Sequence, residues 1–143
     1  MSTWPRRFAT VLLLALGSAT AAADVVVVVV SPENPLSSLT RRQVADIFLG
    51  KSQRFPDGRS AVPLDQAAGS AAQAQFYQLV SDKRATEIKA YWAKMIFTGR
   101  GQPPAAVGDD AQMKQALAAD PNAIGYLDQQ AVDASVKVLS VSE

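Results

Sequence analysis

The sequence predicts an α/β fold, with one mixed, mainly parallel sheet flanked by helices. The first observation is a continuous run of valines at positions 25–30, which is typical of a strand buried on both faces, as in the centre of a parallel sheet. The second is apolar spacing of the helical period, which recurs at 40–49, 70–80, 86–97 and 109–118. The third is that short strand-like runs separate these helices. Alternation of this kind indicates an α/β domain.

The first 23 residues are interpreted as a secretory signal peptide. Two arginines open a short apolar stretch, and three alanines precede Asp24, which is the pattern of a cleaved export signal. The alternative is an uncleaved membrane anchor that continues into 25–30, but Asp24 interrupts that run. We therefore expect a periplasmic chain of residues 24–143, one domain without a stable membrane anchor.

Composition excludes several classes of function. Removing the two arginines of the signal from 14 basic residues leaves 12 against 13 acidic ones, so nucleic acid is not an expected partner. The chain has no cysteine and no histidine, which removes disulfides, histidine-based catalysis and most zinc sites. The adjacent pair Asp109-Asp110 is interpreted as a helix cap. We expect no enzyme activity, no cofactor and no metal site.

The first helix has the clearest local signals. Thr40 followed three residues later by Gln43 matches a capping box, and Leu39 can pack on Val44 as a hydrophobic staple. Gly50 is placed to end this helix. A turn at 55–58 and a short strand at 61–64 are expected to follow.

Two further helices are expected to bury apolar stripes. The helix over 70–80 is predicted to bury Ala72, Phe76, Leu79 and Val80. The helix over 86–97, ending at Gly99, is predicted to bury Ile88, Trp92, Met95 and Ile96.

The remainder of the chain predicts a loop, a helix and two strands. The loop at 99–104 leaves Arg100 free to meet solvent or an anion. Asp109 is expected to cap a helix that runs to about residue 118. Strands are expected at 124–126 and 136–141, the second from its near-alternating valines.

Four segments carry a resemblance to a known family. They are LTRRQVADIFLGK (39–51), FPDG (55–58), YWAKMIFTGRGQPP (91–104) and PNAIGY (121–126). In this order and spacing they resemble the periplasmic phosphate-binding proteins of ABC transporters. The resemblance implies one lobe of a type II periplasmic-binding-protein fold, since those receptors close two lobes over the anion and this chain is too short for both. It also implies phosphate or another small oxyanion as ligand, and transporter membrane subunits as partners.

The resemblance further implies an anion-binding turn at the start of the second helix. The lobe in the family contributes an arginine followed by Ser-Gly-Thr, and these positions fall here on Gln66, Ser70, Ala71 and Ala72. Gly69 and Ser70 keep the helix start, which favours a negative group, whereas the arginine is absent. Arg100 is the candidate to compensate. Ser70 is open to two roles, a helix cap or an anion ligand.

Two functions therefore stay open. The first is a solute-binding-like protein with weak or altered phosphate binding, with a homodimer as one way to rebuild the cleft. The second is a module on the same scaffold that binds another envelope protein and no solute.

Overall fold

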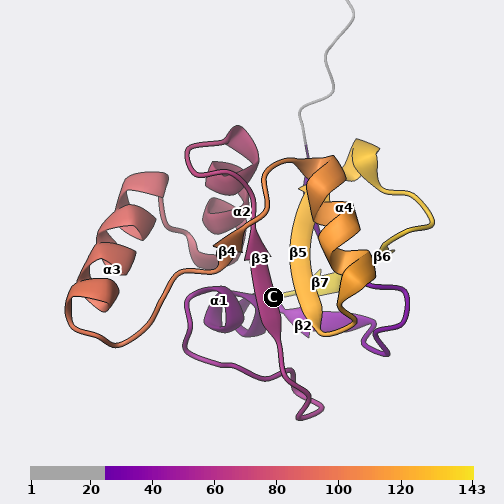
Figure 1. The fold of residues 1–143 in the computed structure, drawn as a ribbon, viewed down its shortest axis with the longest axis horizontal. Coiled ribbons are helices and arrows are strands. Elements are labelled where there is room, and N and C mark those ends of the chain that lie inside the picture. Colours follow the sequence, from indigo (N-terminus) through magenta and orange to yellow (C-terminus); the bar gives the residue numbers. More distant parts are fainter. Residues whose placement is uncertain (1–24) are drawn as a thin grey trace, which may run out of the picture.

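The computed structural model describes residues 25–143, so the predicted signal peptide lies outside the described residues. A five-stranded sheet has the order β4-β3-β5-β1-β6, and β2 and β7 form a separate parallel pair (Figure 1). In chain order the elements are β1 (Val26–Val30), β2 (Ser38–Thr40), α1 (Arg41–Phe48), β3 (Val62–Asp65), α2 (Ala71–Ser81), α3 (Ala85–Phe97), β4 (Ala105–Ala106), α4 (Asp110–Ala119), β5 (Ala123–Asp128), η1 (Gln129–Ala131), β6 (Lys137–Val138) and β7 (Ser140–Ser142).

Five of the six valines form the strand β1, inside the sheet and mostly buried as predicted, whereas Val25 precedes the strand and is exposed. Its neighbours differ from the expectation, because β1 is antiparallel to both β5 and β6. Strands β3, β4 and β5 are parallel to one another, and β6 points the same way because it opposes β1. The sheet is therefore mixed and mainly parallel, as predicted. An unbroken β-branched run reports burial on both faces but carries no information on strand direction.

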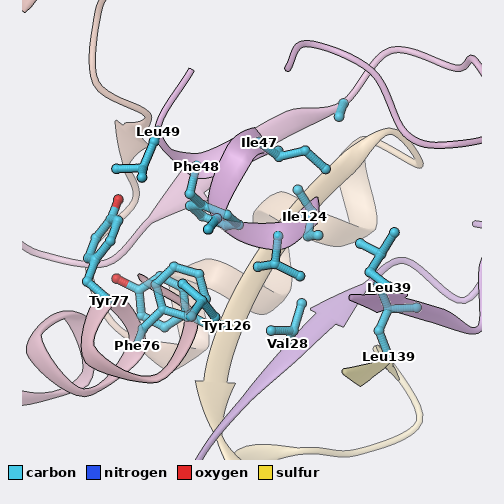
Figure 2. Packing of buried hydrophobic residues seen from close by; sticks show 14 of the residues in the cluster. Val28, Leu39, Ile47, Phe48, Leu49, Phe76, Tyr77, Ile124, Tyr126 and Leu139 are labelled. Atoms are coloured by element: carbon cyan, nitrogen blue, oxygen red, sulfur yellow. The ribbon is translucent and has the colours of Figure 1, made fainter. Parts of the chain in front are cut away.

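Both faces of the sheet are covered. Val28 packs on one face in a cluster with Phe48 of α1 and Phe76 of α2, as Figure 2 shows. Val29 points to the other face, where it packs with Met113 and Leu117 of α4. Successive side chains of a strand alternate between faces, so one valine strand supplies both hydrophobic clusters.

The predicted cap of α1 is present. The amide of Gln43 donates a 3.1 Å hydrogen bond to the Thr40 hydroxyl, and the amide of Thr40 donates one of 2.9 Å to the Gln43 side chain. Leu39 and Val44 are both buried in the same cluster, as a hydrophobic staple requires. Gly50 follows the helix with a positive φ of 73°, a conformation that favours glycine.

The predicted burial of two residues is wrong. Leu79 of α2 is 49% exposed and Ile96 of α3 is 47% exposed. Helix α2 buries Tyr77 instead of Leu79, and α3 lies at the edge of the molecule beside α2 (Figure 1), where only Ile88 and Trp92 become buried. A helix at the edge buries a narrower stripe than a helix that covers a sheet.

The last predicted strand is divided in two. Lys137–Val138 joins the main sheet as β6, and Ser140–Ser142 pairs with β2 as β7. Leu139, at the division, is buried. The other predicted strands and helices lie within a few residues of their expected positions, whereas β2, β4 and η1 were not predicted. No helix within residues 25–143 has the length and apolar character needed to cross a membrane.

Candidate functional site

The turn after β3 places Gln66 inside the protein. Gln66 is only 4% exposed. Its side-chain Nε2 donates a 2.8 Å hydrogen bond to the Asp110 carboxylate and one of 2.9 Å to the Tyr126 carbonyl oxygen. Both hydrogens of this amide are therefore engaged, and one of them is held by an acidic group. The side chain at the position where the resemblance places an arginine is therefore bound to the protein itself.

The residue before Gln66 is a buried carboxylate that sequence reasoning missed. Asp65 is 5% exposed and accepts hydrogen bonds from the Gln66 amide at 3.0 Å, the Tyr77 hydroxyl at 2.8 Å and Gln73 Nε2 at 3.3 Å. The Tyr126 hydroxyl donates a further, short one. The ring of Phe76 stacks on that of Tyr126 with centroids 4.0 Å apart and contacts Tyr77 edge-on at 5.2 Å, as Figure 2 shows. The Asp65 carboxylate is therefore the common acceptor for the hydrogen-bond donors beneath the turn.

This environment also changes the two phenols. Burial, followed by the negative charge of Asp65, raises the pKa of Tyr77 and of Tyr126 above the ordinary value. Removing a proton from either phenol would put a second negative charge beside Asp65 in a poorly solvated place. Both tyrosines therefore act as hydrogen-bond donors. The sequence signal for this cluster was an acidic residue directly after the apolar strand residue Leu64.

Gly69 and Ser70 form the start of α2. Gly69 has a φ of 79°, which favours glycine, and its amide donates to the side chain of Gln73 at 3.0 Å. The Ser70 hydroxyl accepts from the Gln73 amide at 3.2 Å. Ser70 is therefore the N-cap of α2, so the cap role considered for it is confirmed.

Part of the predicted site lies together in one cavity. Gln66, Ala71 and Ala72 line a cavity of about 210 Å³. The same cavity is lined by three carboxylates, Asp109, Asp110 and Asp128. The amino ends of α2 and α4 meet here, and each would favour a negative group. The carboxylates oppose a free anion, so the helix ends alone do not make this cavity anion-selective.

Arg100 is not part of this cavity. It lines a separate one of about 170 Å³ together with Ala61 and Pro63, which lie at the amino end of β3. Gln66 follows the carboxyl end of the same strand. The compensation expected from Arg100 is therefore not found in this structure, and the two positions lie toward opposite ends of β3.

The described part of the chain, residues 25–143, contains no group of three or more acidic side chains placed to hold a metal ion. Around Gln66, hydrogen bonds join the turn to Asp110 of α4 and Tyr126 of β5. The Gln66 side chain therefore leaves no free donor for a ligand.

Comparison with known proteins finds no matching family model and no matching curated protein. Solved structures are similar. One is described as a phosphate ABC transporter substrate-binding protein of Clostridium perfringens with bound phosphate (TM-score 0.66, 23% identity), and another is an ABC-type phosphate transport receptor of Vibrio cholerae (0.66, 20%). A third is PstS of Borrelia burgdorferi (0.63, 17%).

Each of these three comparisons covers 82% of this chain but only 45%, 46% and 47%, respectively, of the solved structure. The chain therefore spans less than half the length of the proteins it resembles. At this level of identity the likeness concerns the fold. This chain has the α/β fold of part of a phosphate ABC transporter substrate-binding protein, as the sequence motifs predicted.

Proposed function

We propose that this chain is an exported, solute-binding-like protein with an altered oxyanion site, which binds phosphate or a related oxyanion weakly. The observation that carries the proposal is the state of Gln66. It stands where the resemblance to phosphate-binding proteins places an arginine, and its amide is bound to Asp110 and Tyr126.

The expected loss of anion affinity can be estimated from the absence of the arginine. A hydrogen bond from a charged donor contributes about 1.5–3 kcal/mol, so its loss weakens binding by roughly ten- to a hundredfold. Asp109, Asp110 and Asp128 around the cavity weaken anion binding further, because like charges repel in a partly desolvated place. A free anion would have to compete with carboxylates for the same helix ends.

A second surface is needed to enclose a ligand. Binding sites cover most of the surface of a small ligand, and this chain spans less than half the length of the similar solved structures. A homodimer in which two copies face each other at the turn would supply the missing side. Membrane subunits of an ABC transporter are the partners that this function implies.

Calorimetry with phosphate and sulfate tests the proposal. We expect weak heats for both anions, decreasing as salt rises because the cavity is partly exposed. Sedimentation with and without phosphate shows whether the anion promotes a dimer. Tight binding of either anion by the unaltered protein would contradict an altered site.

One observation favours a second function, binding of another envelope protein. Phe97 at the end of α3 is 92% exposed and the adjacent Ile96 is 47% exposed. Exposed apolar side chains that lie together are a feature of interaction surfaces. Phe97→Ser should then reduce cross-linking to a partner in the envelope, whereas Val138→Ser, at an exposed valine of β6, should not. Equal cross-linking by both variants would remove this candidate.

A further inference from the structure

A second, larger cavity lies between the β3–α2 turn and helix α3. Its volume is about 490 Å³, within the range typical of small-molecule sites. None of its lining residues lines the Gln66 cavity. The residues that line it are Ala68, Gly69, Gln73, Ala85, Thr86, Ile88, Lys89 and Trp92.

The charge of this cavity is opposite to that of the Gln66 cavity. Lys89 is the only ionisable residue in its lining. Lys89 forms no ion pair with any residue in the range 25–143. The nearby acidic residue Glu87 is already bound to Arg84 at 3.3 Å. A negative group in this cavity would therefore meet one unpaired cation and no lining carboxylate.

Two further features of α3 provide donors. No side chain accepts from the amides of Ala85 and Thr86, the first two residues of the helix, which both line the cavity. The Glu87 carboxylate accepts from the preceding amide, that of Arg84, at 3.3 Å. Free amides at a helix start favour an anion. In addition, Nε1 of Trp92 is buried and has no acceptor, which is costly for an N–H group.

The indole also has a defined orientation. Its six-membered ring packs toward Gly50, where an added Cβ would lie 3.3 Å from Cη2. Trp92, Ile88 and Ala68 give the cavity an apolar wall.

We propose that this cavity binds a small apolar carboxylate. The carboxylate group is held by Lys89 and the first amides of α3, and the apolar body packs on Ile88 and Trp92. The site and the ligand differ from those of the proposed function, so neither proposal depends on the other.

Phenylacetate is a suitable probe, because it combines an aromatic body with one carboxylate. The chain contains two tryptophans, Trp4 and Trp92, so the Trp4→Phe variant of the full chain leaves Trp92 as the only indole. We expect millimolar phenylacetate to change the emission of Trp92 and to give saturable heats in calorimetry. The neutral phenylacetamide should bind at least about fivefold more weakly, because it lacks the charge-assisted contact. Inorganic phosphate should leave the emission unchanged.

Variants of α3 and of the turn locate the site. Lys89→Gln should weaken phenylacetate binding about five- to tenfold. Lys94→Gln is the matched control, because Lys94 is exposed on the same helix and outside the cavity lining, and it should change nothing. Ala85→Leu and, independently, Ala68→Leu should abolish binding by filling the space. Both alanines are exposed, so at least one of these variants should fold normally.

Three results would overturn the proposal. They are no saturable binding of phenylacetate, equal binding of phenylacetate and phenylacetamide, and equal effects of Lys89→Gln and Lys94→Gln. Each can occur whether or not phosphate binds near Gln66, so the failure of one proposal is distinguishable from the failure of the other.

Discussion

The hydroxyl of Tyr77 donates a 2.8 Å hydrogen bond to the carboxylate of Asp65, and both groups are buried. This bond joins helix α2 to the end of strand β3 directly beneath the candidate anion turn. The carboxylate of Asp65, a group of the protein itself, thus holds the turn in place. We expect the position of Gln66, the residue after Asp65, to depend on this support.

Tyr77→Phe should therefore lower the free energy of unfolding by about 1.5–3 kcal/mol, the usual contribution of a hydrogen bond to a charged group. Guanidinium denaturation measures the change. Tyr91→Phe is the control, because the Tyr91 hydroxyl donates only to a neutral carbonyl, that of Leu49, at 2.6 Å, and its loss should cost about 1 kcal/mol. A larger loss for Tyr91→Phe would mean that the Asp65 cluster adds little stability.

Stability should fall in alkaline solution. The folded-state pKa of Tyr77 and of Tyr126 is raised above the ordinary value of 10.0, so the unfolded chain loses these protons first. The stabilisation is complete below about pH 10 and is lost progressively as the pH rises above it. Denaturation curves across this range should be less steeply pH-dependent in the double variant Tyr77→Phe, Tyr126→Phe. An unchanged dependence would show that other groups cause the alkaline loss.

Phe48→Ala should cost about 3–5 kcal/mol through the cavity that it leaves. The Phe48 ring is fully buried and lies 4.6 Å from the ring of Phe76, centroid to centroid. Thr40→Ala, which removes only the cap of the same helix, should cost about 1 kcal/mol. Thermal melts of both variants test the ranking, and similar melting temperatures would contradict it.

Gln66→Arg alone should restore little phosphate binding, because the new guanidinium would pair with Asp110, which already holds the Gln66 amide. Adding Asp110→Asn should release the arginine and strengthen binding by roughly tenfold or more, if one charged contact is regained. Calorimetry compares the two variants with Asp110→Asn alone. If the double variant binds no better than Asp110→Asn, residues 66–72 do not line an anion site.

Mass spectrometry of the periplasmic fraction should find a chain that begins at Asp24, because the three alanines before it match the pattern of a predicted cleavage signal. Replacing Ala23 with a large residue should cause precursor to accumulate. Recovery of the full-length unaltered chain in the membrane fraction would contradict the predicted export and cleavage.

Local signals made parts of this fold predictable. The α1 cap involves Thr40 and Gln43, three residues apart, so the sequence contains the whole interaction. The direction of β1 was not predictable, because its partners lie in β5 and β6, far along the chain. The burial of Leu79 and Ile96 was misjudged because it depends on which helices cover the sheet.

The position of the turn before α2 was predictable, but the hydrogen bonds of Gln66 were not. Glycine and serine at a helix start locate a turn, and the structure has that turn. Whether Gln66 points outward to a ligand or inward to Asp110 depends on α4, which begins more than 40 residues later. The placement of Arg100 likewise depends on the path of the loop that precedes β4.

The antiparallel pairing of β1 has a consequence for the order of folding. Val26 pairs with Asp128 and Val29 with Val138, so an interior strand of the sheet comes from the first described residues and its partners from among the last. Contacts between such distant positions form slowly. A chain emerging from a ribosome or a translocation pore cannot complete this sheet until β5 and β6 have also emerged. We expect the protein to stay unfolded, and in need of protection from aggregation, until almost all of the chain has emerged.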